Sequence, residues 1–169
     1  MHRINRIQIF IGALALFLGS FVYLIDRPPE HTFFVKTSHI TISLYNTLPN
    51  LFGPFGSSLP TYVHVFSFIL ITAGLMTYRK RGYLIICLGW FLVDVAFELG
   101  QKFNGWSAGI IPDWFDGIPL LEGSRSYFLK GTFDFLDLVA ICLGTITAYF
   151  LLSITNRNSK GENHEKFKK

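Results

Sequence analysis

Five ionisable side chains fall within or beside strongly apolar stretches of this sequence, where a charge is costly. They are His64, Asp94, Glu98, Asp134 and Asp137, and Gln101 follows Glu98 by three residues. A charged group at the centre of a bilayer costs about 2.5–3.5 kcal/mol on insertion scales unless it is paired, protonated or in contact with water. We therefore take these six residues as the candidate functional site.

Their side chains can do two kinds of chemistry. Carboxylates and an imidazole bind divalent cations, so His64, Glu98, Asp134 and Asp137 are candidate metal ligands. Close carboxylates also share protons and act as general acid and base, with His64 as ligand or proton shuttle and Gln101 orienting a substrate or a carboxylate. A hydrogen-bonded network that only fixes helix register needs the same residue types. The residues alone leave these alternatives open.

The composition is that of an integral membrane protein. Of the 169 residues, 50% are hydrophobic and 15% are charged, whereas soluble domains carry about 25% charged residues. The net charge of +4 does not form a basic face with interleaved aromatic residues. The lipid bilayer is therefore the expected partner, and nucleic acid is a poor one.

Four stretches are long and apolar enough to cross a hydrocarbon core, which takes about 20 helical residues. They are Ile7–Ile25, Thr61–Tyr78, Gly82–Gln101 and Thr132–Ser153. The predicted fold is an all-α bundle of four transmembrane helices with two long interfacial loops on the outer side. The membrane domain covers residues 1–155, and the polar, basic segment 156–169 is predicted to be a disordered cytoplasmic tail.

The basic residues predict the orientation. Ten of the fifteen Lys and Arg residues lie in the N-terminal end, the Arg79–Arg81 link and the C-terminal tail. Because cytoplasmic segments are enriched in these residues, both termini should be cytoplasmic in a multi-pass protein of the cell membrane. The outer loops, Thr32–Pro60 and Asn104–Phe128, contain many aromatic residues, and Trp106 and Trp114 suit a membrane interface. Such loops lie on the outer leaflet, enter the mouth of the bundle, or simply cap the helices.

With this orientation the candidate residues converge. At 1.5 Å per residue, all of them lie within about 10–12 Å of the outer boundary. Asp94, Glu98 and Gln101 are spaced by four and three residues and share one helix face, as Asp134 and Asp137 share another. Since buried polar groups in a membrane face the bundle interior, these faces and His64 should meet.

Other common sites are not indicated. A haem held by two histidines needs both in the bundle, and His64 is the one histidine within a predicted span. The sequence has no Gly-rich phosphate loop, G-x-S-x-G or H-E-x-x-H motif. Cys87 and Cys142 lie in apolar runs without metal-ligand spacing, so we expect two small buried thiols.

Three pieces of the sequence resemble the VanZ-like family, which is named after a protein associated with teicoplanin resistance. They are LPTYVHVFSFILITAGL around His64, FELGQ with Glu98 and Gln101, and FDFLDLVAICLG with Asp134 and Asp137. Their order is similar to the family's H…E-x-x-Q…D-x-x-D…G pattern over about residues 59–150. The family often has an Arg before the first Asp, where this chain has Lys130-Gly131. Lys130 or Arg125 would then supply that positive charge.

The resemblance implies a bacterial inner-membrane protein of the cell envelope, of a family whose activity is undefined for most members. Because the cluster faces the outer leaflet, the expected ligand is a lipid head group or an envelope precursor. An anionic ligand would need a cation, such as a divalent metal ion, to offset the carboxylates. The alternative is a non-catalytic accessory subunit of a larger membrane complex, which the many Phe residues and apolar loops favour. A proton-coupled transporter is a weaker third reading because inverted repeats and broken helices are missing from the sequence.

Overall fold

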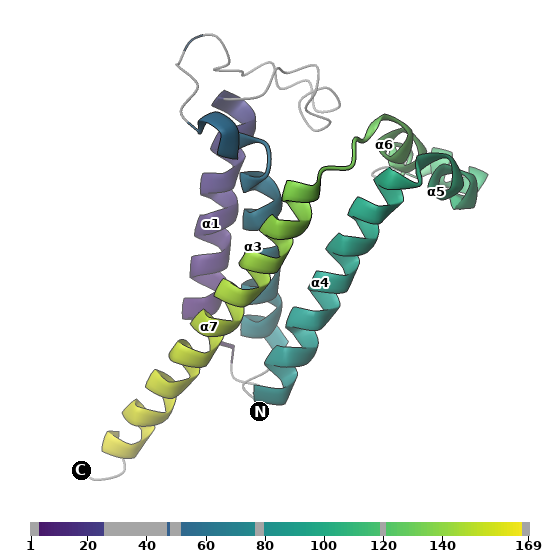
Figure 1. The fold of residues 1–169 in the computed structure, drawn as a ribbon. Helices are drawn as coiled ribbons and strands as arrows, with labels where there is room; N and C mark the ends of the chain where they lie inside the picture. Colours follow the sequence, from purple (N-terminus) through teal and green to yellow (C-terminus); the bar gives the residue numbers. More distant parts are fainter. Residues whose placement is uncertain (1–3, 26–46, 48–51, 77–79, 119–120, 167–169) are drawn as a thin grey trace.

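The computed structural model describes residues 4–25, 47, 52–76, 80–118 and 121–166, and within these ranges it is all-helical. Four long helices form the body of the molecule, and shorter helices join them (Figure 1). The long helices are α1 (Arg6–Ile25), α3 (Leu59–Met76), α4 (Lys80–Lys102) and α7 (Phe135–Lys166). The short ones are η2 (Gly53–Gly56), α5 (Asn104–Ile110), η3 (Asp113–Gly117) and α6 (Ser124–Lys130).

Three segments are long and apolar enough to cross a membrane: Leu59–Met76, Lys80–Lys102 and Phe135–Thr155. They correspond to the second, third and fourth predicted spans. The first predicted span, Ile7–Ile25, forms helix α1, but its apolar part, Arg6–Val22, is shorter than the other three. The chain is therefore an all-α, multi-pass membrane protein by the length and composition of these three helices.

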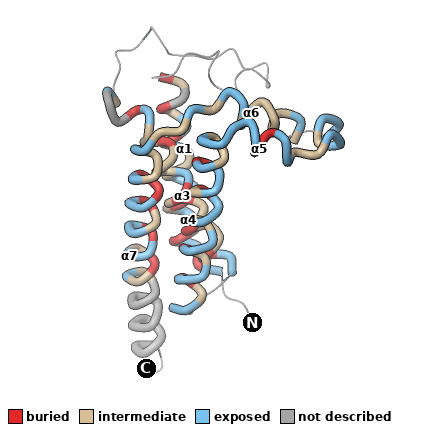
Figure 2. Tube along the Cα trace, turned by 45° about the vertical axis from the view of Figure 1, so that its right-hand side comes forward, coloured by how far each residue is buried: buried red, intermediate tan, exposed pale blue. Residues whose placement is uncertain are grey.

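Helix α3 lies at the centre of the bundle and contacts α1, α7 and α4. The core where these helices meet is apolar, because an apolar side chain between helices packs without leaving a polar group unsatisfied. Its buried members are Val65, Ile69, Leu70, Ala73, Tyr83, Cys87, Ile141, Ala148 and Leu152. Large apolar side chains elsewhere on α1, α4 and α7 are exposed, as a lipid-facing surface requires, and Figure 2 shows these exposed turns in blue.

Small residues let α3 approach its neighbours closely. A Cβ atom added to Gly12 of α1 would lie 2.9 Å from the carbonyl oxygen of Ser67. A Cβ atom added to Gly144 of α7 would lie 2.8 Å from the carbonyl oxygen of Tyr62. Helix association within a membrane depends on such close van der Waals packing, because lipid tails are as apolar as the side chains they replace.

The two ends of the bundle differ. At the terminal end lie the start of α1, the end of α3, the start of α4 and the end of α7; at the loop end, α5 and α6 extend sideways from the top of α4 (Figure 1). At the terminal end, the Gln8 Nε2 atom donates hydrogen bonds to Tyr83 Oη at 3.3 Å and to Thr155 Oγ1 at 2.9 Å. These three residues, the Gln8 network, connect α1, α4 and α7.

Two predicted regions are described only in part. Most of the first outer loop, Thr32–Pro60, falls outside the described residues, but Pro60 lies in the first turn of α3, where a missing backbone N–H costs nothing. The boundary predicted at residue 155 is not the end of a helix, because α7 continues to Lys166. The predicted disorder of the tail 156–169 stays a prediction.

Candidate functional site

A cavity of about 710 Å³ lies at the loop end of the bundle, between α3, α4 and the segment that contains η3 and α6. Its polar lining includes His64, Asp94 and Glu98. Aromatic rings form much of the remaining wall: Trp90, Phe97, Phe115, Tyr127 and Phe128. We call this space the loop-end cavity. It combines buried carboxylates with a large apolar surface, so it suits a ligand with a polar head and an apolar tail.

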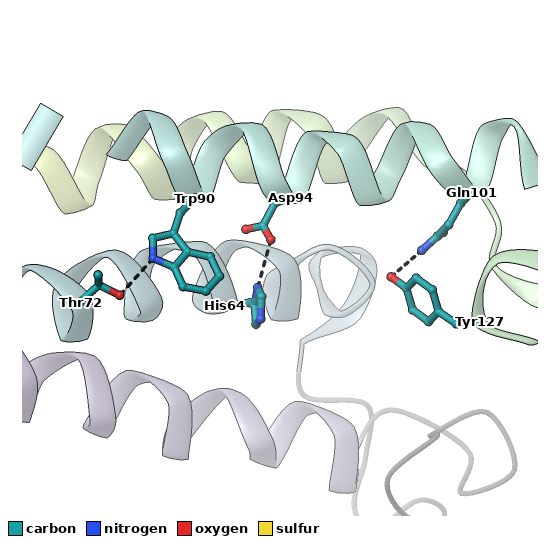
Figure 3. Close-up of polar contacts among 6 residues, drawn as sticks. All are labelled: His64, Thr72, Trp90, Asp94, Gln101 and Tyr127. Carbon is teal, nitrogen blue, oxygen red and sulfur yellow. Dashed lines mark hydrogen bonds and ion pairs between the residues drawn. The ribbon is translucent and has the colours of Figure 1, made fainter. Parts of the chain in front are cut away.

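His64 and Asp94 connect α3 with α4 inside this cavity (Figure 3). The distance from His64 Nδ1 to Asp94 Oδ1 is 3.5 Å, and the pair is an ion pair when His64 is protonated. The His64 side chain is 48% exposed while that of Asp94 is 9% exposed. The His64 ring packs edge-on against Phe68, with centroids 4.4 Å apart. Asp94 and the neighbouring ring therefore hold an accessible imidazole in place.

Trp90, which lines the cavity, also packs near the His64 and Phe68 rings. Its Nε1 atom donates a hydrogen bond to Thr72 Oγ1 at 3.0 Å, which Figure 3 shows beside the His64–Asp94 pair. Its ring stacks on Phe68 at 4.8 Å between centroids and faces the His64 ring edge-on at 6.3 Å. The hydrogen bond satisfies the indole N–H within an apolar bundle and fixes the orientation of the ring.

Glu98 lies one helical turn from Asp94, and it is only 7% exposed. The Asp134 backbone N–H hydrogen-bonds to the Glu98 carboxylate, and the charges of Asp137, Asp134 and Asp94 act on it. The structure thus brings α4 and the start of α7 together at this carboxylate. One oxygen of each buried acid, Asp94 Oδ2 and Glu98 Oε2, has no hydrogen-bond partner within the part of the chain that the structure describes.

Asp134 has a different place from the one predicted. It precedes α7, and its Oδ1 atom accepts a hydrogen bond from the Leu136 backbone N–H at 2.9 Å, so it is the N-cap of that helix. Asp137 follows in the first turn of α7. The first turn of a helix favours negative charge because its free N–H groups point outward. This local field stabilises the acidic groups that gather around Glu98.

Gln101 contacts a tyrosine. Its Nε2 atom donates a hydrogen bond to Tyr127 Oη at 2.7 Å (Figure 3). Its side chain also packs on Gly131, where an added Cβ atom would lie 2.7 Å from Gln101 Cδ. Tyr127 lines the loop-end cavity, whereas Gln101 is not among its lining residues. Gln101 therefore holds in place a ring of the cavity wall that α6 contributes.

Arg125 is engaged away from the carboxylates. Its Nη2 atom donates to the Ile111 carbonyl at 2.9 Å and to Asp113 Oδ1 at 2.7 Å. The hydrogen bond to Asp113 raises the pKa of Arg125 above its ordinary value. These bonds connect η3 to α6, and both segments line the cavity. The expectation that Arg125 supplies a positive charge to the acidic cluster is therefore wrong, and Lys130 lies exposed at the end of α6.

Among the described residues, no group of three or more His, Cys, Asp or Glu side chains that could hold a metal ion is found. Metal binding by His64, Glu98, Asp134 and Asp137 stays a prediction. Of the two thiols expected to be buried, Cys87 is buried but Cys142 is exposed on α7.

The sequence alone did not identify the aromatic wall. Phe115, Tyr127 and Phe128 belong to the loop 104–128, which has no regular hydrophobic period from which to infer an inward face. Trp90 and Phe97 lie on the same side of α4 as Asp94. Their helical spacing from the acidic residues is therefore the sequence signal that could have placed them in the cavity wall.

No family model, curated protein or solved structure matches this chain. The resemblance to the VanZ-like family therefore rests on the sequence motifs around His64, Glu98 and Asp137.

Proposed function

We propose that this chain is a VanZ-like membrane protein of the bacterial cell envelope, with four transmembrane helices and both termini in the cytoplasm. Helix α1 is the fourth span, because it runs along α3 for its length and closes one side of the bundle. The excess of Lys and Arg at the terminal end supports the orientation. The loop-end cavity then opens at the outer leaflet.

The function we propose is binding of an amphiphile, a lipid or lipid-linked envelope precursor, with its polar head in the loop-end cavity. The observation that carries this proposal is a cavity of about 710 Å³ whose lining combines His64, Asp94 and Glu98 with five aromatic rings. Cavities that take small molecules combine an apolar lining with a few convergent polar groups. A purely structural network needs no such space.

Each candidate residue then has a role. The head group contacts Asp94 and Glu98, and His64, which is the most accessible of the three, is the proton donor or acceptor for a reaction at that head group. Asp137 and the α7 N-terminus keep Glu98 in a fixed electrostatic environment. Asp134 and Gln101 are positioning residues, one for α7 and the other for the α6 wall.

Filling the cavity tests the proposal. Ser124 lines the cavity, while Leu129 on the same helix α6 is 53% exposed. Ser124→Phe should reduce the amount of lipid that co-purifies with the protein, measured by native mass spectrometry, by about tenfold through steric exclusion. Leu129→Phe is the matched control and should leave that amount unchanged. Equal lipid in both variants would contradict the proposal.

Cysteine labelling tests the topology. In a chain with Cys87 and Cys142 replaced by Ser, a membrane-impermeant reagent should label Ser57→Cys and Ser126→Cys from outside intact cells. Ser159→Cys should react only after permeabilisation. Labelling of Ser159→Cys from outside, with the other two protected, would reverse the orientation.

A second candidate function is that of an accessory subunit in a larger membrane assembly. It is favoured by the exposed indole rings of the loop-end segment, since Trp106 is 74% and Trp114 is 64% exposed, and such rings are common anchors of protein interfaces. Stoichiometric co-purification with other membrane subunits, lost in a Trp106→Ser/Trp114→Ser variant, would favour this function. A monodisperse free protein would favour the first.

A further inference from the structure

The charges around the loop-end cavity are unbalanced. Asp94 and Glu98 line it, and among its described lining residues there is no Lys or Arg. The nearest guanidinium of α6, Arg125, is held by Asp113 and the Ile111 carbonyl. Lys102, at the end of α4, lies over the Phe133 ring at 5.1 Å. His64 is therefore the cationic partner available from the lining, and among the acids of the described residues its ion pair is with Asp94.

The two acids also have unused acceptor atoms. Asp94 and Glu98 are each 7% exposed, and Asp94 Oδ2 and Glu98 Oε2 lack a hydrogen-bond donor in the described part of the chain. Buried acceptors without a donor cost free energy, and nearly all such atoms in folded proteins have a partner. Because both residues line one cavity, the two atoms favour a ligand that brings N–H or O–H donors.

The aromatic lining of the cavity favours a cation as the source of those donors. Aromatic faces carry negative potential and attract a cation within about 6 Å of the ring centroid. Five aromatic side chains line this cavity, and two of them, Phe97 of α4 and Phe128 of α6, stack on each other with centroids 5.8 Å apart. The same rings offer apolar surface to a hydrocarbon chain.

We propose that the polar head bound in the loop-end cavity carries a primary ammonium group. This inference rests on the function proposed above and specifies the class of its ligand. A primary ammonium offers three N–H donors and a positive charge, which match the two unpaired carboxylate oxygens and the aromatic wall. A quaternary ammonium brings the charge without donors, and a head group with only negative charge is repelled by Asp94 and Glu98.

Two sources carry this chemistry: an aminophospholipid and a single-chain alkyl amine. The test uses Trp90 as the reporter because it lines the cavity. In a Trp106→Phe/Trp114→Phe background, quenching of Trp90 fluorescence in detergent micelles is measured with lipids that share one brominated acyl chain. The head groups are ethanolamine, choline and glycerol phosphates. Brominated dodecylamine, dodecyltrimethylammonium and dodecanol form the single-chain arm.

The ethanolamine lipid or the primary amine should bind about tenfold more tightly than its quaternary and uncharged or anionic counterparts. The arm that shows this difference identifies the source. Glu98→Gln, and Asp94→Asn/Glu98→Gln together, should reduce the primary amine's affinity to that of the quaternary one. Asp116→Asn, an exposed acid of η3, is the matched control and should change nothing.

The measurements distinguish a failure of the ammonium proposal from a failure of the proposed amphiphile binding. If all head groups quench Trp90 equally, or if the double variant retains the preference for the primary amine, the ammonium proposal is wrong and amphiphile binding stands. If no probe quenches Trp90 in the wild-type background and Ser124→Phe changes nothing, the proposed function itself fails. Thermal unfolding of each variant shows that it is folded before its affinity is read.

Discussion

The two ends of this helix bundle bury different kinds of polar group. At the terminal end, Gln8 is fully buried, and its neutral amide donates to hydroxyls on two other helices. At the loop end, Asp94 and Glu98 are buried acids that line a cavity. Each of the three side chains keeps one oxygen without a hydrogen-bond partner in the described part of the chain, so the ends differ in charge and in the cavity. A neutral amide needs only protein partners, whereas a pair of buried acids needs a counter-charge, which agrees with the ligand proposed for the loop end.

The largest effect on stability should come from crowding the terminal end. A Cβ atom added to Gly74 would lie 2.8 Å from Ile9 Cγ1 and 3.0 Å from the Asn5 carbonyl oxygen. Gly74→Leu should therefore destabilise the fold by about 1–3 kcal/mol through overpacking of α1 on α3. Nothing lies within 4 Å of such an atom at Gly89, so Gly89→Leu is the control. Equal Tm values for the two variants would show that α1 and α3 do not pack as described.

Removing the Gln8 amide should have the next largest effect. Gln8→Leu replaces the amide with an apolar side chain of similar size, and it leaves the Tyr83 and Thr155 hydroxyls without this donor. The expected loss is about 1 kcal/mol of stability, read as a lower Tm, with ligand affinity unchanged. The comparison variant is Gln101→Leu at the loop end, which removes the hydrogen bond to Tyr127 and should lower affinity more than Tm. A loss of affinity in Gln8→Leu together with a loss of Tm alone in Gln101→Leu would contradict the roles assigned to the two ends.

Neutral amides at the acidic cluster should separate stability from function. Glu98→Gln and Asp137→Asn keep the shape of each side chain and remove its charge. Because buried like charges repel, Tm should stay the same or rise, while ligand binding or any activity falls at least about tenfold. Thermal unfolding and the Trp90 quenching assay measure the two quantities on the same samples. Wild-type binding in both variants would leave only a structural role for these carboxylates.

The smallest effect is expected at the exposed Arg125–Asp113 pair. Asp113 is 92% exposed in its side chain, so water and salt screen the pair. Since the pKa of Arg125 is raised, its favourable contribution is present below its ordinary value and is lost only as pH rises through the higher folded value. Asp113→Asn should therefore leave Tm unchanged at neutral pH, with no new pH dependence between about pH 5 and 9. A clear loss of Tm would show that η3 is a stabilising part of the cavity wall.

The sequence predicted the long helices because they follow from periodicity and hydropathy. The depth of the acidic residues in the membrane stays a prediction. The sequence did not predict that Asp134 caps α7, although an Asp before an apolar run is an N-cap signal, because the predicted span already included it. It also did not indicate the Gln8 network, since partners 75 and 147 residues apart are brought together only by tertiary packing. The cavity wall from residues 111–128 depends on a loop path that no local pattern determines.

The Gln8 network has a consequence for biosynthesis. Gln8 lies near the start of α1, and Thr155, its most distant partner, is made 147 residues later. At about 5–20 residues per second, the ribosome takes on the order of ten seconds or more to cover that interval. Until Tyr83 has been made, 75 residues after Gln8, the amide has neither hydroxyl to bind, and it then has Tyr83 alone until Thr155 is made. The complete network therefore forms last, and a nascent chain that stops before Thr155 lacks the connection that Gln8 makes between α1 and α7.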